Sequence, residues 1–502
     1  MSQATIYDKD LLALQEMRTA VQKAKEAQAI YQTFTQEQVD AIVKHVAEKA
    51  YEASETLAEL AVKETKMGVV EHKKIKNEVG SRDVYESIKD LKTAGIVRED
   101  RTNKVLEIAD PFGVVLAIIP TTNPTSTAFF KTLIALKTRN AIVVSPHPYA
   151  VKCTKAALDV CREAAEEAGA PEGLMHILTY SSMEATSQAM KHPDIDLILA
   201  TGGGALVKAA YSSGKPAYGV GPGNVPVYVE KSAKLDVASK QIIDSKSFDN
   251  GTICATEQAI VVDEAIKEAF IKKIEQQGAY ILSPAEKEKM EKLISPQPGR
   301  VNPAIVGKSA KYIAKQAGIQ VPDNTRVIIG LETKVGKDIP FSLEKLSPVF
   351  ALYIAKNVEE AKNICMDLLD LGGRGHSLSL HTEDDHIART FAIDMPVSRM
   401  LVNTMSSIGA VGGTTGLKPS MTLGCGSFGG NITSDNISAE HLINIKRMAY
   451  GTKTVELPKE TTTNEDLFDE DEIKATLNAH ISNQLDQALI ENIVEKVIKK
   501  LS

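Results

Sequence analysis

The chain has 502 residues, of which 43% are hydrophobic and 25% charged, and its formal net charge is −7. This length is too great for one hydrophobic core, which predicts two or three domains of a soluble globular protein. The acidic balance without a basic block argues against nucleic-acid binding, and no apolar run is long enough to span a membrane.

Five cysteines at irregular spacings, with no CxxC motif, argue against a disulfide framework or a zinc site. They favour a reducing cytoplasm, and we expect no bound metal. The N-terminal stretch has early acidic residues and no apolar core segment, so we expect no signal peptide.

Residues from about 8 to 98 show helical periodicity. Beyond them, short apolar runs alternate with longer amphipathic stretches, which is typical of parallel strands joined by crossover helices. The predicted class is therefore α/β. The expected strands are "GVVLAIIP", "NAIVVSPH", "DLILATGGG", "VPVYVE", "EQAIVVD", "RVIIGLE", "FALYIA" and "SLSLHT".

Cys254 lies between a turn-forming Asp-Asn-Gly and an apolar strand. A thiolate held there could meet a substrate at the rim of a sheet, or the residue could be a small buried hydrophobe. The local sequence favours the buried hydrophobe, because most isolated cysteines in cytosolic enzymes are inert core residues.

Several polar positions follow or precede the expected strands. Gly202 and Gly203 stand before a helix, where a backbone can approach a phosphate, although glycines also serve tight turns. The Asn123 amide could donate to an oxyanion or cap a helix, and the cap is favoured locally. For Glu344 a solvated charge is the default interpretation, and for His376 a structural hydrogen bond is at least as frequent as catalysis.

Taken in order, these motifs resemble the aldehyde dehydrogenase superfamily, and within it the CoA-acylating branch. The resemblance covers about residues 10 to 450 and extends to the aldehyde dehydrogenase half of bifunctional aldehyde-alcohol dehydrogenases. It is carried by "PTTNPTSTAFFKTLIALKTRNAIVVSPHP", "SFDNGTICATEQ", "EKLSP" and "TLGCGSFGGN". It implies that Cys254 is the nucleophile and Asn123 the oxyanion donor.

The resemblance also implies a nicotinamide cofactor beside Gly202, Gly203 and Thr121, with Glu344 on the ribose next to the nicotinamide. NAD is expected, with NADP as the alternative, because Ser145 stands where the hydrolytic branch has a lysine for the adenosine ribose.

The acyl acceptor implied by the resemblance is CoA. The hydrolytic branch carries a glutamate that activates water, and here Gly219, in "GVGPGN", stands in its place. Without that base, attack by water is slow and a thiol is the better acceptor. We place His376 on the acceptor side of the site.

The implied fold has a Rossmann-like cofactor domain, an α/β catalytic domain and a small oligomerisation hairpin, in a homodimer or homotetramer. The expected ranges are 1–235 for most of the cofactor domain, with an oligomerisation strand near 98–112, then 236–420 for the catalytic domain with Cys254, and 421–450 for the return to the cofactor domain.

The tail has two expected parts. Residues 453–480 are polar and acidic, which predicts a linker or a disordered segment. Residues 481–502 predict a helix with an apolar stripe, and a helix so tethered resembles the encapsulation peptides of bacterial microcompartments. The alternatives are a helix docked on the protein's own oligomer and a membrane-surface helix. The stripe consists of Leu485, Leu489, Ile490, Ile493, Val494, Val497, Ile498 and Leu501.

Together these features imply oxidation of a short-chain aldehyde, with acetaldehyde favoured, in the lumen of a microcompartment whose shell protein binds residues 481–502. The alternatives are propionaldehyde, sulfoacetaldehyde or another small aldehyde, a hydrolytic dehydrogenase, and an inactive scaffold protein.

Overall fold

The computed structural model describes residues 8–180, 182–457, 469–480 and 487–501. The chain divides into two compact units. The first lies within Met1–Glu99 and Leu106–Met448 and holds the two large sheets and the candidate site. The second lies within Asp100–Val105 and Ala449–Ser502.

The N-terminal part of the first unit is helical, as its periodicity predicts. Thr35 and Gln38 form a capping box that starts the second helix, because each side chain satisfies a free backbone N–H of the first turn. A single π-helical turn, Val79–Asp83, joins the last two helices. The helices are α1 (Lys9–Tyr31), α2 (Gln36–Glu52), α3 (Ser54–Thr65), α4 (Val70–Glu78) and α5 (Val84–Ile88).

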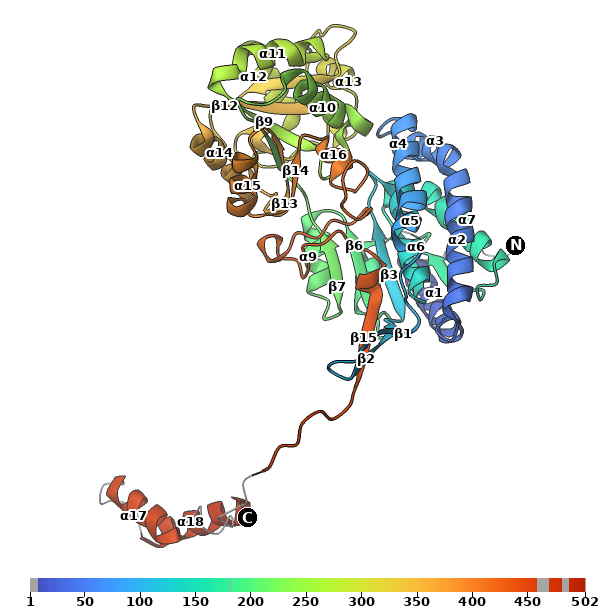
Figure 1. Cartoon of the computed structure of the whole chain (residues 1–502), viewed down its shortest axis with the longest axis vertical. Coiled ribbons are helices and arrows are strands. Elements are labelled where there is room, and N and C mark those ends of the chain that lie inside the picture. Colours follow the sequence, from blue (N-terminus) through green and yellow to red (C-terminus); the bar gives the residue numbers. More distant parts are fainter. Residues whose placement is uncertain (1–7, 181, 458–468, 481–486, 502) are drawn as a thin grey trace. The chain divides into compact units, whose positions relative to one another are not determined.

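A five-stranded parallel sheet follows, with strand order β5-β4-β3-β6-β7 (Figure 1). The chain runs outward from β3 to β5 and then returns to the other side of β3 as β6, so the order reverses between β3 and β6. Such a reversal opens a crevice at the carboxyl ends of the strands, where doubly wound folds bind ligands. The strands are β3 (Val114–Ile119), β4 (Ala141–Pro146), β5 (Met175–Ile177), β6 (Leu197–Thr201) and β7 (Ala217–Val220).

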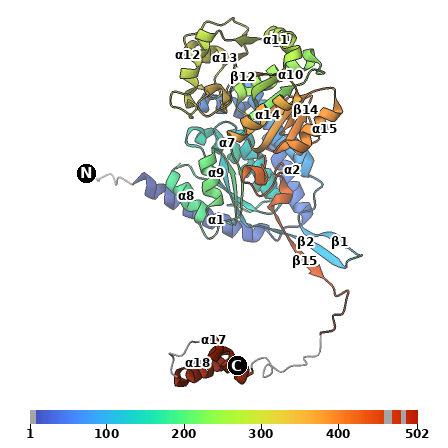
Figure 2. The same ribbon diagram turned by 90° about the vertical axis from the view of Figure 1, so that its left-hand side faces the viewer.

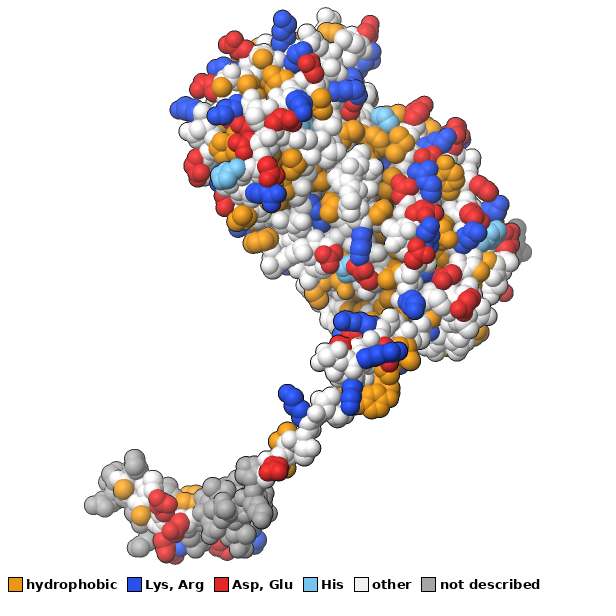
Figure 3. All heavy atoms as spheres, viewed as in Figure 1, with side chains coloured by type: hydrophobic (Ala, Val, Ile, Leu, Met, Phe, Trp, Pro, Cys, Tyr) orange, Lys and Arg blue, Asp and Glu red, His pale blue; other side chains and the backbone are white. Residues whose placement is uncertain are grey.

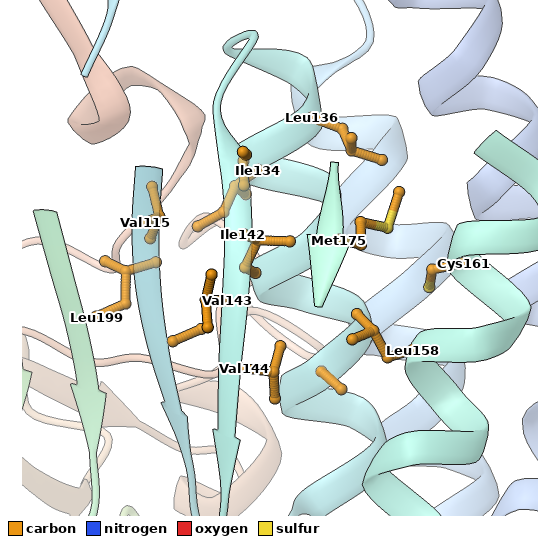
Figure 4. Close-up of a cluster of buried hydrophobic side chains, with 14 of the residues drawn as sticks. Val115, Ile134, Leu136, Ile142, Val143, Val144, Leu158, Cys161, Met175 and Leu199 are labelled. Atoms are coloured by element: carbon orange, nitrogen blue, oxygen red, sulfur yellow. The ribbon is translucent and has the colours of Figure 1, made fainter. Parts of the chain in front are cut away.

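Crossover helices cover this sheet, and α1 lies beside α8 (Figure 2). Every residue of β3 and β4 is buried, which is why these strands read as continuous apolar runs. Figure 4 shows the side chains of Val144 and Met175, from two neighbouring strands, next to Leu158 and Cys161 of α7. The helices are α6 (Pro124–Lys137), α7 (Val151–Glu167), α8 (Met183–Lys191) and α9 (Gly204–Tyr211).

The second sheet has seven parallel strands in the order β10-β11-β12-β9-β8-β13-β14. Its strands are β8 (Val225–Val229), β9 (Glu257–Asp263), β10 (Ala279–Ile281), β11 (Val327–Leu331), β12 (Val349–Ala355), β13 (Gly375–His381) and β14 (Val397–Val402). Its helices are α10 (Leu235–Ser247), α11 (Lys267–Gln276), α12 (Pro284–Ile294), α13 (Ala310–Gln316), α14 (Val358–Asp370), α15 (Asp385–Asp394) and α16 (Ser406–Gly409).

All eight expected strands are present, and the two parallel sheets with crossover helices confirm the predicted α/β class. One boundary differs from the expectation. Strand β8 falls within the predicted range 1–235, yet it pairs with β9 and β13 of the second sheet. The chain therefore passes from the five-stranded to the seven-stranded sheet in the glycine-rich turn at 221–224. Strand β8 is fully buried, and it has a neighbouring strand on each side in the seven-stranded sheet.

A third, three-stranded sheet has the order β1-β2-β15. Its strands are β1 (Gly95–Asp100), β2 (Val105–Pro111) and β15 (Ile443–Ala449). Just before β15, Ile437, Ala439 and Leu442 are buried in the same core as the five-stranded sheet. The chain after residue 421 thus returns to that core.

In the second unit, residues 453–457 have no regular structure. The end of the segment expected as a linker forms a helix, α17 (Glu470–His480), and a further helix, α18 (Gln487–Leu501), follows. Of the predicted stripe, Leu489, Ile493 and Val497 are about half exposed, whereas Val494 is buried. The side chains of Leu485, Ile490 and Leu501 lie outside the described residues.

In the part of the chain that the structure describes, no helix is long and apolar enough to cross a membrane. Acidic and basic side chains are interspersed over the face of the first unit in Figure 3.

Candidate active site

Cys254 lies in the loop between a 3₁₀ turn at Phe248–Gly251 and strand β9. Its side chain is half-buried and packs against an apolar cluster that includes Val220, Ile253 and Ala255. Burial, together with the negative charge of Glu344, raises the pKa of the Cys254 thiol to about 12, although its own backbone N–H opposes the shift. The thiol is therefore protonated near neutral pH in this state. The Cys254 loop leads into β9 of the seven-stranded sheet, and it packs against Val220 at the carboxyl end of β7 in the five-stranded sheet.

The other four cysteines, Cys153, Cys161, Cys365 and Cys425, are buried free thiols. Burial raises the pKa of each of them. Cys254 is thus the one cysteine of the chain that is only partly buried, which the local sequence alone did not favour.

Asn123 occupies the N-cap position of α6, but its side chain makes no capping hydrogen bond. The cap favoured by the local sequence is therefore wrong. Its amide nitrogen donates instead to Thr122 Oγ1 (3.1 Å) and to the Thr252 carbonyl oxygen (3.4 Å), two residues before Cys254. Its amide oxygen accepts from Lys76 Nζ at 2.6 Å. Because an ammonium only donates, this bond identifies the oxygen and leaves the amide nitrogen facing the Cys254 loop.

Gly223 brings three of the predicted residues together. Its backbone N–H donates to Glu344 Oε1 at 3.0 Å. A Cβ at Gly223 would lie 2.4 Å from the Cys254 carbonyl oxygen and 3.0 Å from the His376 ring, so no side chain fits there. The close approach of Cys254, His376 and Glu344 therefore depends on a glycine, which the sequence showed only as part of a turn.

His376 is fully buried at the start of β13. Its Nδ1 lies 3.1 Å from Ser377 Oγ, and its Nε2 has no hydrogen-bond partner in the described structure. Burial, aided by the charge of Arg399, lowers the pKa of His376 to about 3. The ring is therefore neutral, and it can offer one nitrogen to a polar group.

Glu344 is next to the turn at 221–224, and burial raises its pKa to about 7. The Gly223 N–H and the buried Lys246 and Lys345 oppose this shift. Glu344 is not the solvated charge that its local sequence suggests. Near neutral pH it exchanges between an ionised acceptor and a protonated donor.

Gly219 is buried within β7, and its surroundings leave no room for a side chain. A Cβ would lie 2.7 Å from Val207 Cγ1 and 3.1 Å from the ring of Tyr211, both from α9. The Tyr211 hydroxyl accepts from the Gly219 N–H at 3.0 Å. Tyr211 and Val207 thus fill the space into which a carboxylate at this position would extend.

The residues predicted at the cofactor lie at the carboxyl ends of β3, β4 and β6. Thr121 follows β3, and its hydroxyl is buried without a hydrogen-bond partner in the described structure. Gly203 follows β6, and a Cβ there would meet no atom within 4 Å, whereas at Gly202 it would approach Leu206 at 2.9 Å. Ser145, at the end of β4, is buried with its hydroxyl 2.9 Å from Thr186 Oγ1.

These features fit a dinucleotide. Thr121, Gly202 and Gly203 flank the strand-order reversal between β3 and β6, where such ligands bind. The orphaned Thr121 hydroxyl and the open backbone at the start of α9 offer polar contacts, and Glu344 can accept from ribose hydroxyls. In the described residues, no group of three His, Cys, Asp or Glu side chains is arranged to hold a metal ion.

A buried cluster of two lysines and an aspartate, which the sequence does not predict, lies beside Asn123. Lys73 and Lys76 of α4 are both 2% exposed, and both bind the carboxylate of Asp249, which is fully buried. In the sequence, Lys73 and Lys76 stand three residues apart, and Asp249 follows far along the chain in "FDNG". No local pattern indicates that these three side chains meet.

The chain is similar in sequence and in structure to known aldehyde dehydrogenases. The family model described as "Aldehyde dehydrogenase family" matches residues 2–298. The bifunctional aldehyde-alcohol dehydrogenase AdhE of Escherichia coli (strain K12) is 46% identical over 452 residues, which are 88% of this chain and 51% of that protein. The chain thus spans about half the length of the curated relatives it matches.

Two solved structures are also similar. An acetylating aldehyde dehydrogenase from Geobacillus thermoglucosidasius is 52% identical with a TM-score of 0.89, covering 91% of this chain and 100% of that one. A propionaldehyde dehydrogenase from the Clostridium phytofermentans fucose utilisation bacterial microcompartment is 30% identical with a TM-score of 0.80, covering 87% and 97%. These similarities confirm the predicted fold and resemblance.

Proposed function

We propose that this chain, which belongs to the aldehyde dehydrogenase family, oxidises a short-chain aldehyde with NAD and transfers the acyl group to CoA. The observation that carries the proposal is the convergence of Cys254, Glu344 and His376 on Gly223, with the Asn123 amide turned to the same loop. This arrangement supplies a nucleophile, an oxyanion donor and a ribose acceptor in one place.

In the first half-reaction, the Cys254 thiolate attacks the aldehyde carbon. A C–S bond forms, and the electron pair of the C=O bond moves to the oxygen. The Asn123 amide and the Cys254 backbone N–H, which donates to no other residue in the described structure, stabilise this oxyanion. NAD, when bound, supplies the hydride acceptor. The C=O bond then re-forms as the hydride leaves, and Cys254 carries a thioester.

Ionisation of the buried Cys254 thiol depends on its neighbour. The charge of Glu344 is the second cause of its raised pKa, after burial. Near neutral pH Glu344 is partly protonated, and in its neutral form it does not repel a thiolate. We therefore infer that the thiol ionises more readily while Glu344 is protonated.

CoA is the proposed acceptor in the second half-reaction. Its thiolate attacks the thioester carbon, and Cys254 leaves as a thiolate, so the kinetics are ping-pong. Water lacks a general base, because Gly219 stands where the hydrolytic branch has a glutamate, and Val207 and Tyr211 fill the space that its side chain would need. This filling argues against a hydrolytic dehydrogenase. We place the neutral His376 ring, with its free Nε2, on the acceptor side.

Acetaldehyde is the substrate we favour, because the bifunctional and acetylating relatives are similar over most of this chain. Propionaldehyde is the second candidate, favoured by the microcompartment relative. An NADH absorbance assay with short aldehydes, NAD or NADP, and CoA tests the proposal. Activity with none of them would favour an inactive scaffold protein.

We further propose that the enzyme works in a bacterial microcompartment, with residues 481–502 bound to a shell protein. Two observations support this: one similar protein comes from such a compartment, and α18 leaves Leu489, Ile493 and Val497 exposed on one face. Residues four apart on a helix share a face. The proposed assembly is a homodimer or homotetramer through the β1-β2-β15 sheet, where Ile96 and Ile445 are exposed.

A further inference from the structure

The buried cluster beside Asn123 joins three separate parts of the chain. Lys76 Nζ donates to Asn123 Oδ1 (2.6 Å), to Thr252 Oγ1 (2.9 Å) and to the Asp249 carboxylate. Lys73 Nζ donates to the same carboxylate (3.0 Å) and to the Thr122 carbonyl oxygen (2.9 Å). Helix α4 thereby holds both the loop after β3 and the loop that carries Cys254.

Asp249 is built into this position. Its backbone has φ +47°, and its carboxylate also accepts from Thr252 Oγ1 (2.7 Å) and the Val69 N–H (2.8 Å). A Cβ on Gly68, which itself has φ +81°, would lie 2.0 Å from the carboxylate. The chain thus uses a left-handed backbone and a glycine to keep this one carboxylate between the two lysines.

The cluster carries an excess of positive charge. Two buried lysines face a single carboxylate, and His72, which contacts the backbone of Asp249, has its pKa lowered by burial. Burial opposes ionisation of Asp249, but Lys73 and Lys76 outweigh it and lower its pKa to about 2. Burial also lowers the pKa of Lys76 to about 8, while Asp249 and, more weakly, Cys254 oppose the shift. Near neutral pH the Lys76 ammonium is therefore charged, and it shares the Asp249 carboxylate with Lys73.

That charge reaches the candidate active site through Asn123. Because Lys76 holds the amide oxygen, the amide nitrogen cannot rotate away from the Cys254 loop. A charged donor on the oxygen also polarises the amide, which makes its N–H₂ group a stronger donor to an anion. The bond from that group to Thr252 is long, at 3.4 Å, so it is readily exchanged for a better acceptor.

We propose that Lys76 is a positioning residue for the reaction: held by Asp249, it orients and polarises the Asn123 amide so that this amide donates to the oxyanion formed at Cys254. The inference rests on the proposed function. Lys73 shares the same helix, burial and carboxylate but contacts Thr122 rather than Asn123. It is therefore a matched control.

A double-mutant cycle tests the inference. The rate of NADH formation is measured in the wild type, Asn123→Ala, Lys76→Met and the double variant, with thermal melting to confirm folding. If Lys76 acts through Asn123, Lys76→Met lowers kcat with little change in the KM for NAD. Asn123→Ala, which costs the wild type about 10²-fold, then costs the Lys76→Met background less than about threefold. In a Lys73→Met background it keeps its full effect.

Two results would overturn the inference. Multiplicative losses in the Lys76→Met cycle would show that the two residues act independently. Equal coupling of Asn123 to Lys73 and Lys76 would show a general loosening of the cluster. If Lys76→Met does not fold, Lys76→Gln, which keeps a polar head without charge, replaces it in the same cycle. A wild type without aldehyde-dependent activity would instead refute the proposed function.

Discussion

The amide nitrogen of Asn123 lies 3.4 Å from the carbonyl oxygen of Thr252, so the loop after β3 is tied to the loop that carries Cys254. The first loop follows β3 of the five-stranded sheet, and the second loop precedes β9 of the seven-stranded sheet. This contact thus holds the proposed oxyanion donor next to the loop of the proposed nucleophile.

Cys254→Ala should abolish aldehyde-dependent NADH formation but leave binding of NAD intact, because only this thiol forms the covalent intermediate. The matched control is Cys365→Ala, which removes a buried thiol from the second sheet's core. It should lower stability more than activity. If Cys254→Ala keeps about a tenth of the wild-type rate or more, the nucleophile is another residue.

Asn123→Ala should lower kcat by about 10²-fold, as expected when one oxyanion donor is lost. The KM for the aldehyde should change much less, because the bond forms only as charge develops on the oxygen. Steady-state kinetics at saturating NAD and CoA give both constants. An unchanged kcat would leave Asn123 with a purely structural role.

Binding of NAD should weaken as the pH falls through about 7, the pKa of Glu344. Burial raises this pKa, so the carboxylate is ionised above pH 7 and loses acceptor capacity below it. At about pH 6 the affinity should be about 10-fold lower than at its alkaline plateau.

Titration calorimetry of NAD binding across this range measures the effect in the wild type and in Glu344→Gln. The variant should bind weakly at every pH. It also separates Glu344 from the neighbouring Lys345, whose pKa burial lowers to about 7. A variant with the same pH dependence as the wild type would assign the titration to another group.

Deleting residues 481–502 should leave kcat and KM nearly unchanged and prevent co-purification with shell proteins. The exposed face of Leu489, Ile493 and Val497 needs a partner surface, because a short helix is only marginally stable alone in water. A fluorescent protein that carries this segment should enter compartments when they are made. If the deletion splits the oligomer or destroys activity, the helix is a structural clasp.

The sequence was sufficient for the strands, because fully buried parallel strands are near-continuous apolar runs, as β3 is and as β4 is apart from Ser145. The roles of Cys254 and Asn123 come only from the resemblance and stay predictions, since the local patterns favoured a core cysteine and a helix cap. The helix α17 was missed because its residues are mostly polar and acidic.

The lysine cluster could not be predicted in the same way. Lys76 and Asp249 are far apart in the chain, and a lysine on a polar helix such as α4 is expected to face water. Gly223 likewise carries no sign of its neighbours, because the need for a glycine arises only when the Cys254 loop and His376 of β13 approach it. Such sites are specified by tertiary packing and not by local pattern.

The most direct test of acyl transfer through Cys254 is the pre-steady-state formation of NADH with aldehyde and NAD in the absence of CoA. We expect a burst of about one equivalent per site and then almost no turnover, because the thioester lacks a base to activate water. Adding CoA should restore steady turnover. Sustained formation of the free acid without CoA would contradict the account.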